Sequence, residues 1–294
     1  MFSLEGYQAV HAKGGVVRRT DRRVLAVSGA DRASWLQGLL TNDVASLAEG
    51  ESRYAAYLTP QGRMITDMNV VAREGRLLLD VPAVLAASLR ERLDGLIFSE
   101  DAQVTDESGR VLVWTMIDGR LTDLVGVSLP AEFKSLPEID LDTFEVIRIE
   151  RGVPRFLADM DEDTIPLEAG IEDRAISFSK GCYVGQEVIV RVTTRGGGRV
   201  AKRLVRWHAD DSATVVPLPE SRIFSSTPST QAPPPDAETP SLRAGKDIGR
   251  VTSAVFSPLL NKVVGLGYVH RDFVEPETNV TIVWNDAPIK AVVK

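Results

Sequence analysis

The stretch SFSKGCYVGQEVIVR, residues 177–191, holds Cys182, the only cysteine in the 294-residue chain. A thiol becomes reactive when a nearby cation or a helix N-terminus lowers its pKa. Lys180 lies two residues before Cys182, and a helix is predicted to begin at GQEVIVR, just after it. A catalytic cysteine also needs a base such as histidine, and the stretch contains none. The local sequence therefore leaves a reactive thiol and an inert, partly buried small residue equally open.

Residue counts exclude several kinds of site within this chain alone. Iron-sulphur clusters are ordinarily held by about four thiolates, so Cys182 can supply only one ligand to a cluster shared with a partner. The three histidines, His11, His208 and His270, are scattered and form no close-spaced pair with a carboxylate that would indicate zinc. The chain has no Walker A motif and no dinucleotide fingerprint. No metal site is expected within the chain by itself.

Two carboxylates stand in apolar surroundings. Glu150 comes late in a predicted helix, DLDTFEVIRIERG, and Asp67 lies within a predicted strand, RMITDMNVVA. A buried carboxylate requires a partner. For Glu150 the partner is either a structural cation, Arg148 or Arg151, or a ligand that presents adjacent donors. Asp67 poses the same choice.

Charge patterning argues against a nucleic-acid binder. The chain carries 34 basic and 41 acidic residues, a formal net charge of −7, whereas such binders usually contain a basic domain. The run from Arg191 to Arg206 holds six Lys and Arg and no acid, and we interpret it as a solvated face rather than an anion site. The acidic segment around Asp159 lacks the spacing of a calcium loop, so we expect a solvated loop there.

Hydrophobic periodicity predicts an α+β arrangement for the first 118 residues. One helix is predicted over 30–44 with Asp31 as its N-cap, and a second over 82–96 with Pro82 in its first turn. The simplest packing is one mixed sheet with both helices on one face. The predicted strands are 22–29, 52–58, 63–72, 76–81, 102–108 and 110–118.

The C-terminal third reads as a small antiparallel β-barrel. Residues 209–245 contain seven of the 16 prolines and many Ser and Thr, so we expect a flexible loop there. A single cysteine permits no internal disulfide, and no apolar run is long enough to cross a bilayer, so we expect a cytoplasmic protein. The barrel strands are predicted at 201–208, 249–257, 263–270, 279–284 and 288–294.

The block KGCYVGQE resembles the signature of the YgfZ-type folate-binding proteins, which are relatives of the T-protein (aminomethyltransferase) of the glycine cleavage system. Five further blocks agree in order and spacing, so the resemblance covers nearly the whole chain apart from the proline-rich segment. These blocks are WLQGLLTNDV, AAYLTPQGRMITD, RIERGVPRF, IPLEAGIED and GRVTSAVFSPLLNKVVGLGYV.

The resemblance implies a T-protein-like α+β fold with three lobes around a central folate channel. Residues 1–199 would form a folate-binding region of two interleaved α+β lobes with ferredoxin-like elements. Residues 200–294 would form a β-barrel domain interrupted by the flexible loop at about 209–245. The implied function is the assembly or repair of iron-sulphur clusters in target enzymes. The implied cofactor is tetrahydrofolate or a derivative, and the implied partners are cluster assembly proteins or cluster-dependent enzymes.

The resemblance also assigns roles to residues. Cys182 would be the functional thiol, assisted by Lys180, and Glu150 would accept the adjacent donors of the pterin ring. The T-protein has an Asp pair where this chain has Thr66 and Asp67, so only Asp67 is expected beside the folate, and this departure disfavours aminomethyl transfer. The remaining cofactor-binding candidates are Arg191, for the glutamyl tail, with Tyr183, Gln186 and Glu187.

Two other functions stay open. One is a folate-dependent aminomethyl or C1 transferase, and the other is a folate-binding scaffold in which Cys182 does no chemistry. Whether the chain is an enzyme is left open; if it is one, a tetrahydrofolate-dependent C1 transferase is expected. Neither nucleic acid nor a membrane is expected as a partner.

Overall fold

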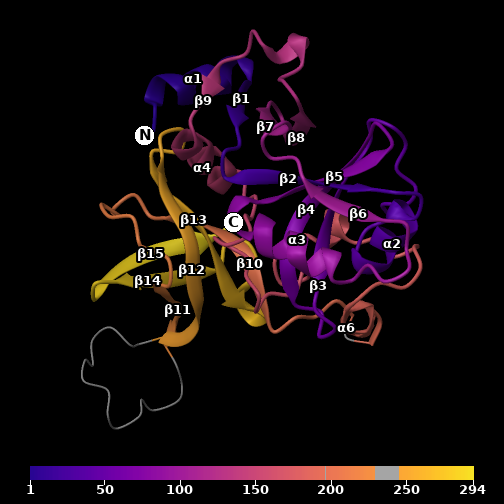
Figure 1. The fold of residues 1–294 in the computed structure, drawn as a ribbon. Coiled ribbons are helices and arrows are strands. Elements are labelled where there is room, and N and C mark those ends of the chain that lie inside the picture. The colour runs from indigo at the N-terminus through magenta and orange to yellow at the C-terminus, as the bar shows by residue number, and fades with distance from the viewer. Residues whose placement is uncertain (196, 229–244) are drawn as a thin grey trace. The chain divides into compact units, whose positions relative to one another are not determined.

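The computed structural model describes residues 1–195, 197–228 and 245–294 (Figure 1). The chain divides into two compact units. The first unit comprises 1–145, 161–166 and 171–191, and the second comprises 146–160, 167–170 and 192–294. Residues 229–244 of the loop predicted at about 209–245 lie outside the described residues.

A five-stranded antiparallel sheet forms the centre of the first unit. Its order is β3-β4-β5-β2-β6, and two helices, α2 (Arg32–Leu39) and α3 (Ala86–Asp94), cover one of its faces. Side chains of both helices join alternate strand residues in one buried core, as the apolar periodicity predicts. The strands are β2 (Arg22–Ser28), β3 (Ser52–Leu58), β4 (Met64–Arg73), β5 (Arg76–Pro82) and β6 (Gln103–Asp106).

A second, four-stranded sheet packs against the other face of the first. Val24 and Leu78 of the five-stranded sheet share a buried cluster with Val113 and Val125 of the second sheet. The expectation of one mixed sheet is therefore wrong, because alternation marks a strand without specifying its neighbours. The order is β8-β7-β1-β9, with β1 (Gly15–Arg18), β7 (Leu112–Ile117), β8 (Leu121–Gly126) and β9 (Glu138–Ile139).

The helix boundaries differ in detail from those predicted. Asp31 takes the N-cap position of α2 as predicted, but its carboxylate accepts a hydrogen bond from the backbone of Asp101 instead of capping α2. A π-helical turn, Arg191–Arg195, extends the helix predicted after Cys182. The other α-helices are α1 (Leu4–Lys13), α4 (Leu141–Glu150), α5 (Glu172–Ala175) and α6 (Gln186–Val190).

The second unit contains a closed barrel of six antiparallel strands in the order β10-β13-β12-β11-β14-β15. Trp207, Val251 and Ile282 are nearly inaccessible in its core. The α+β class and the C-terminal barrel are confirmed. The strands are β10 (Lys202–Ala209), β11 (Arg222–Pro228), β12 (Gly245–Ser257), β13 (Lys262–His270), β14 (Asn279–Trp284) and β15 (Ala287–Val293).

Strand β11 falls inside the range that was predicted as a flexible loop. It pairs with β12 and β14, and its Ile223 is 1 % exposed in the barrel core. The expectation of a loop is thus wrong for 222–228, because the surrounding Pro, Ser and Thr conceal the single inward-facing apolar residue. Residues 229–244 lie outside the described residues.

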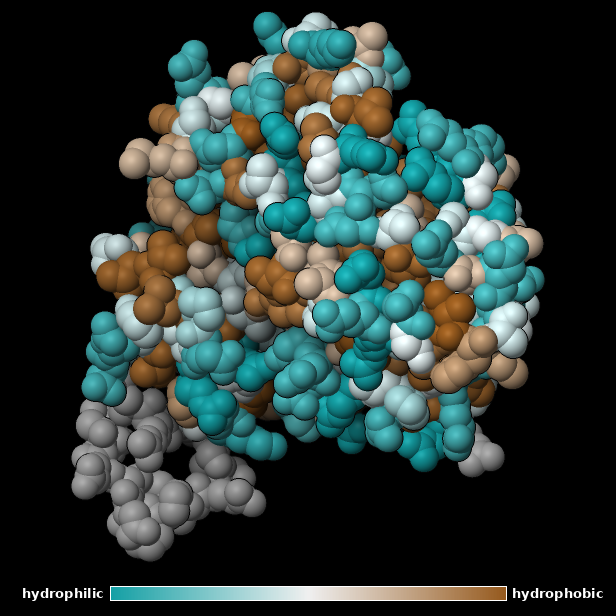
Figure 2. Space-filling view, in the orientation of Figure 1, coloured by the Kyte–Doolittle hydropathy of each residue, from teal (hydrophilic) through white to brown (hydrophobic). Residues whose placement is uncertain are grey.

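The surface is mixed in character. Figure 2 shows hydrophilic residues over much of the visible face, with hydrophobic residues in separate patches between them. Within the described ranges, no helix has the length and apolar character needed to cross a membrane. The cytoplasmic location stays a prediction.

Candidate functional site

The loop that carries Cys182 is tied to the end of α2 by Lys180. The Lys180 ammonium donates to the backbone carbonyls of Gln37, Leu40 and Asn42 at 2.6, 2.6 and 3.0 Å. Carbonyls in and just after the last turn of a helix receive no hydrogen bond from an N–H of the helix. Lys180 donates to them instead, so it serves as the C-terminal cap of α2. Burial lowers the pKa of Lys180 to about 8. All three ammonium donors are used on carbonyls at the end of α2 and just after it, and a part for Lys180 in thiol chemistry stays a prediction.

Polar side chains just after α2 reinforce this attachment. The Thr41 hydroxyl donates to the carbonyl of Ala175 at 2.6 Å, and the Asn42 amide donates to the carbonyl of Arg174 at 2.8 Å. The backbone N–H of Ser177 donates in turn to the carbonyl of Thr41 at 3.1 Å. The two sequence blocks WLQGLLTNDV and KGCYVGQE therefore lie against each other, although they are far apart along the chain.

The C-terminal side of the loop is fixed by Gly185 and Tyr183. Gly185 has φ 83°, in the left-handed region, and a Cβ there would lie 2.6 Å from the carbonyl oxygen of Thr59. Only glycine fits such a backbone position without strain. The Tyr183 side chain is buried, which raises its pKa to about 12, and the Lys180 ammonium lies 5.2 Å from the centre of its ring.

Cys182 itself is exposed between these two attachments. The expectation of a partly buried cysteine is therefore wrong, and whether the thiol is reactive stays open. An exposed thiol on a loop held at both ends can be reached by a partner protein. Of the neighbouring candidates, Gln186 is half-buried at the start of α6, while Glu187 and Arg191 are exposed.

Asp67 belongs to a second polar region, which lies between the two sheets of the first unit. Arg22 donates to Asp67 at 3.0 Å and to Asp80 at 2.7 Å, and the Tyr54 hydroxyl donates to Asp67 at 2.8 Å. All three charged side chains are less than a tenth exposed. We call Arg22, Tyr54, Asp67 and Asp80 the carboxylate cluster.

Asp80 is the least satisfied member of the carboxylate cluster. Its side chain is inaccessible to solvent, and its Oδ2 atom has no hydrogen-bond partner among the described residues. Burial raises the pKa of Asp80 to about 6, against the opposing effect of the Arg22 guanidinium. Leaving a buried acceptor unpaired is costly. The free oxygen is therefore an acceptor that the described residues leave unsatisfied.

The network continues toward the four-stranded sheet. The Asn69 amide of β4 donates to Asp123 of β8 at 2.7 Å, and Thr115 of β7 donates to the other Asp123 oxygen. Arg19 forms an ion pair with Asp21 at 2.8 Å and lies 3.8 Å from Asp123. These contacts pack the two sheets together around charged groups that would otherwise be buried alone.

Sequence reasoning named only Asp67 in this region. An acid within an apolar strand singled out Asp67, and the same signal was present for Asp80 in RLLLDV. Arg22 and Tyr54 gave no such signal, because an arginine at the start of a strand and a tyrosine within one are both common surface residues.

Glu150, the candidate pterin acceptor, is the last residue of α4 and belongs to the second unit. Its side chain is half-buried, and its backbone carbonyl accepts a hydrogen bond from Arg206 at 3.1 Å. The structure thus collects five predicted residues in one segment and assigns the others elsewhere. The five are Lys180, Cys182, Tyr183, Gln186 and Glu187; Arg191 follows them, Asp67 lies in the carboxylate cluster, and Glu150 lies in the second unit.

The acidic segment before Cys182 is not a solvated loop throughout. Asp159 is 2 % exposed and accepts a hydrogen bond from Arg148 at 2.6 Å. The hydroxyls of Thr252 and Ser253 donate to its other oxygen at 2.6 and 2.7 Å. The expectation was wrong for Asp159, because Arg148 lies on the buried stripe of α4 and requires a counter-charge there. This pair attaches the segment to the barrel strands within the second unit.

No metal site emerges from these groups. Among the residues that the structure describes, no set of three or more His, Cys, Asp and Glu is placed to hold a metal ion.

The C-terminal part of the chain matches a known family model. Residues 222–294 match the model described as the glycine cleavage T-protein C-terminal barrel domain. These residues run from β11 to the end of β15, so the match covers most of the barrel described above.

Similar proteins extend the likeness to the rest of the chain. The "Iron-sulfur cluster assembly factor IBA57 homolog, mitochondrial" of Phaeosphaeria nodorum is 27% identical over 297 residues, covering 86% of this chain and 71% of that protein. The "tRNA-modifying protein YgfZ" of an Enterobacter species is 26% identical over 239 residues, covering 67% of this chain and 72% of that protein. The solved aminomethyltransferase T of the glycine cleavage system from Bartonella henselae has a TM-score of 0.78 at 18% identity, covering 99% of this chain and 87% of that one.

Together, the two-sheet unit, the six-stranded barrel and these likenesses define a protein with the T-protein fold. Within that class, the similar sequences include proteins named YgfZ and IBA57, which confirms the resemblance drawn from KGCYVGQE and its companion blocks.

Proposed function

We propose that the chain is a tetrahydrofolate-binding accessory protein for the assembly or repair of iron-sulphur clusters in target enzymes, with Cys182 as its functional thiol. The observation that carries the proposal is the exposed thiol on a loop whose flanking residues are fixed. The name of the Phaeosphaeria nodorum relative, a cluster assembly factor, supports the same role.

Cluster chemistry on this chain requires a partner. A cluster ordinarily needs about four thiolates, and Cys182 is the only cysteine. Its exposure allows a second protein to approach and supply the remaining ligands. Such partners are cluster assembly proteins, which bring the cluster, or cluster-dependent enzymes, which receive it.

The carboxylate cluster supports folate as the small-molecule ligand. A carboxylate can accept the adjacent amino and ring N–H donors of a pterin as a bidentate pair. The Oδ2 of Asp80 supplies one unpartnered acceptor atom, and the Oδ1 of the same carboxylate already accepts from Arg22. When bound, tetrahydrofolate supplies a carrier for one-carbon units.

The remaining folate contacts are proposed for residues named from the resemblance. Glu150 is a further carboxylate for the pterin, and the exposed Arg191 is a cation for the glutamyl tail. Tyr183, Gln186 and Glu187 are proposed to contribute from the Cys182 loop and α6.

Folate binding can be measured directly by calorimetry with tetrahydrofolate. We expect Asp80→Asn and Glu150→Gln each to weaken binding by about tenfold or more, the scale of a hydrogen bond to a charged group. Asp163→Asn, which changes an exposed carboxylate, serves as the matched control and is expected to leave binding unchanged. A variant that binds as the parent does would remove its residue from the site.

The T-protein fold favours one alternative function, a tetrahydrofolate-dependent aminomethyl transferase. Incubating the purified protein with tetrahydrofolate and an aminomethyl-lipoyl carrier distinguishes this transferase from the accessory protein proposed above. We expect no methylene-tetrahydrofolate, because Thr66 stands where the transferases have the first Asp of their pair. Formation of that product would favour the transferase.

The scaffold alternative is tested in cells by measuring cluster-dependent enzyme activities. We expect Cys182→Ala to lower those activities as far as deletion of the whole chain does. Ser179→Ala, at an exposed neighbour in the same loop, is expected to leave them intact. Equal activities for Cys182→Ala and the parent would show that the thiol does no chemistry.

A further inference from the structure

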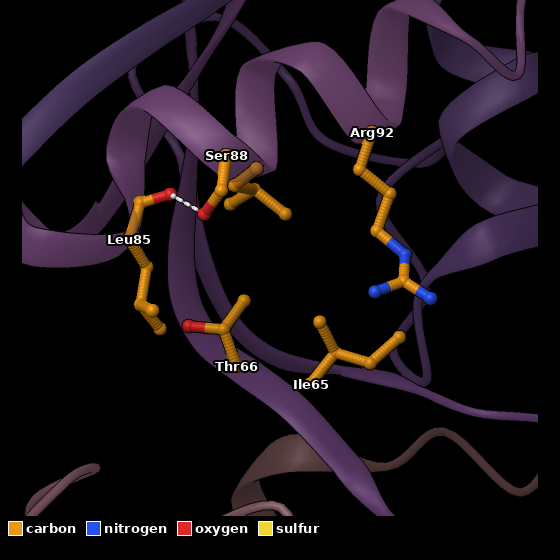
Figure 3. A pocket seen from close by; sticks show the side chains of 6 residues that line it. Ile65, Thr66, Leu85, Ser88 and Arg92 are labelled. Carbon is orange, nitrogen blue, oxygen red and sulfur yellow. Dashed lines mark hydrogen bonds between the residues drawn. The ribbon is translucent and has the colours of Figure 1, made fainter.

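A cavity of ≈ 140 Å³ lies in the first unit between helix α3 and strand β4 (Figure 3). Its apolar walls come from Ile65 of β4, from Leu85, which precedes α3, and from Leu89 within α3. Thr66, Ser88 and Arg92 supply its polar groups. The cavity thus combines an apolar interior with a small number of polar groups, as small-molecule sites usually do.

Arg92 is the one charged group of the cavity. Its side chain is exposed, and Figure 3 shows it extending from α3 along one side of the space. The guanidinium carbon lies 6.0 Å from the centre of the Tyr57 ring. Within the described part of the chain, Arg92 makes no hydrogen bond and no ion pair. Its five N–H donors therefore remain available to a ligand.

The two hydroxyls of the cavity already donate within the protein. Ser88 donates to the carbonyl of Leu85, and Thr66 donates to the carbonyl of Asp67, both at 3.1 Å. Each hydroxyl oxygen keeps its capacity to accept. Among the described residues that line the cavity, the only unmatched charge is therefore positive, which disfavours a cation and matches a single negative charge.

The cavity is distinct from the carboxylate cluster. Successive side chains of a strand point to opposite faces of its sheet. Thr66 lies on the face covered by α3, whereas Asp67, its neighbour in β4, contacts Arg22 between the two sheets. A ligand in this cavity is therefore additional to the folate proposed above.

We propose that this cavity binds a small organic monocarboxylate whose apolar body is no larger than a six-membered ring. A cavity of about 150 Å³ accommodates benzene, so the apolar walls fit a body of that size. The planar guanidinium of Arg92 can hold a carboxylate through two parallel hydrogen bonds. An inorganic dianion would leave the apolar walls unused and would meet only one cation.

Benzoate is a suitable probe, titrated into the full-length protein and followed by amide chemical shifts. We expect saturable shifts confined to α3 and β4. Arg92→Gln should weaken binding by about tenfold or more, since it removes a charge-assisted hydrogen-bond pair. Arg90→Gln, at an exposed arginine on the same helix, is the matched control and should bind as the parent does.

Two further ligands separate the roles of the charge and the apolar body. Benzyl alcohol, which lacks the charge, should bind the parent and Arg92→Gln equally weakly, and acetate, which lacks the ring, should bind the parent more weakly than benzoate. The proposal is overturned if benzoate gives no saturable shifts in α3 and β4. It is also overturned if both arginine variants lose binding equally, or if acetate matches benzoate.

Discussion

The carboxylate cluster and the Cys182 loop differ in the solvent exposure of their functional groups. In the cluster the charged side chains are buried, and Arg22 bridges Asp67 and Asp80. In the loop the candidate functional group, the thiol of Cys182, is exposed. The residues that fix the loop, Lys180 and Gly185, are half-buried and buried. The charges of the cluster are therefore matched within the protein, whereas the loop presents a thiol to solvent.

The contrast also separates the motif KGCYVGQE into two kinds of residue. Lys180 caps α2, and Gly185 accommodates the close approach of a neighbouring carbonyl. These residues hold the loop in place, and Cys182 is among the side chains that the loop exposes. The four predictions that follow test this division from the largest expected effect to the smallest.

Removing the central cation of the carboxylate cluster should have the largest effect on stability. Arg22→Met leaves Asp67 and Asp80 buried without their partner, so we expect the free energy of unfolding to fall by about 3–5 kcal/mol. Chemical denaturation measures this loss. The control is Arg63→Met, which breaks the exposed pair with Asp163 and should cost less than about 1 kcal/mol. Equal losses would mean that the cluster is not held by its buried charges.

The raised pKa of Asp80 predicts a pH dependence. The pKa is about 6 in the fold and 3.8 ordinarily, so protonated Asp80 favours the folded state below pH 3.8, and this contribution is lost as the pH rises through 6. The stability of the parent relative to Asp80→Asn should therefore fall by about 3 kcal/mol between pH 3.8 and pH 7. Chemical denaturation of the parent and of Asp80→Asn across this pH range measures the change in their stability difference. A difference that does not change with pH would contradict the buried carboxylate.

Lys180→Met tests whether Lys180 is structural. The substitution leaves three carbonyls at the end of α2 without their donor, so we expect a loss of about 1–3 kcal/mol in unfolding free energy. Faster proteolysis in the segment 177–185 should accompany it. Lys134→Met, at an exposed lysine, is the control and should change little. An unchanged stability for Lys180→Met would place its function in the chemistry of Cys182 instead.

Cys182→Ala should have the smallest effect on stability. The side chain is exposed, so the free energy of unfolding should stay within about 0.5 kcal/mol of the parent. Thermal or chemical denaturation is sufficient to measure it. A larger loss would mean that the cysteine contributes to the fold, and the contrast with its neighbours would fail.

Much of the fold could be predicted from local patterns. The apolar period of the segments around Trp35 and Leu89 predicted α2 and α3, and alternation predicted most strands of both units. Strand pairing could not be predicted in the same way. The partners of β7 are β1 and β8, and β1 is too short to be recognised by alternation alone.

The candidate site shows the same limit. The motif identified Cys182 and the segment around it, but the acceptors of Lys180 lie 138 to 143 residues away in the sequence, so its capping role required the structure. The partners of Asp80 and Asp159 were likewise hidden, since each is an arginine from another element. Long-range contacts, rather than local residue types, decide which charges are buried.

The most direct test of the account is cluster delivery by purified components. A cluster-loaded donor protein and an apo-enzyme are mixed with the parent or with Cys182→Ala, with and without tetrahydrofolate, and cluster acquisition is followed by visible absorption and recovered enzyme activity. We expect the parent to accelerate acquisition, whereas Cys182→Ala, although folded, should not. Equal acceleration by both proteins would contradict the central claim that Cys182 is the functional thiol.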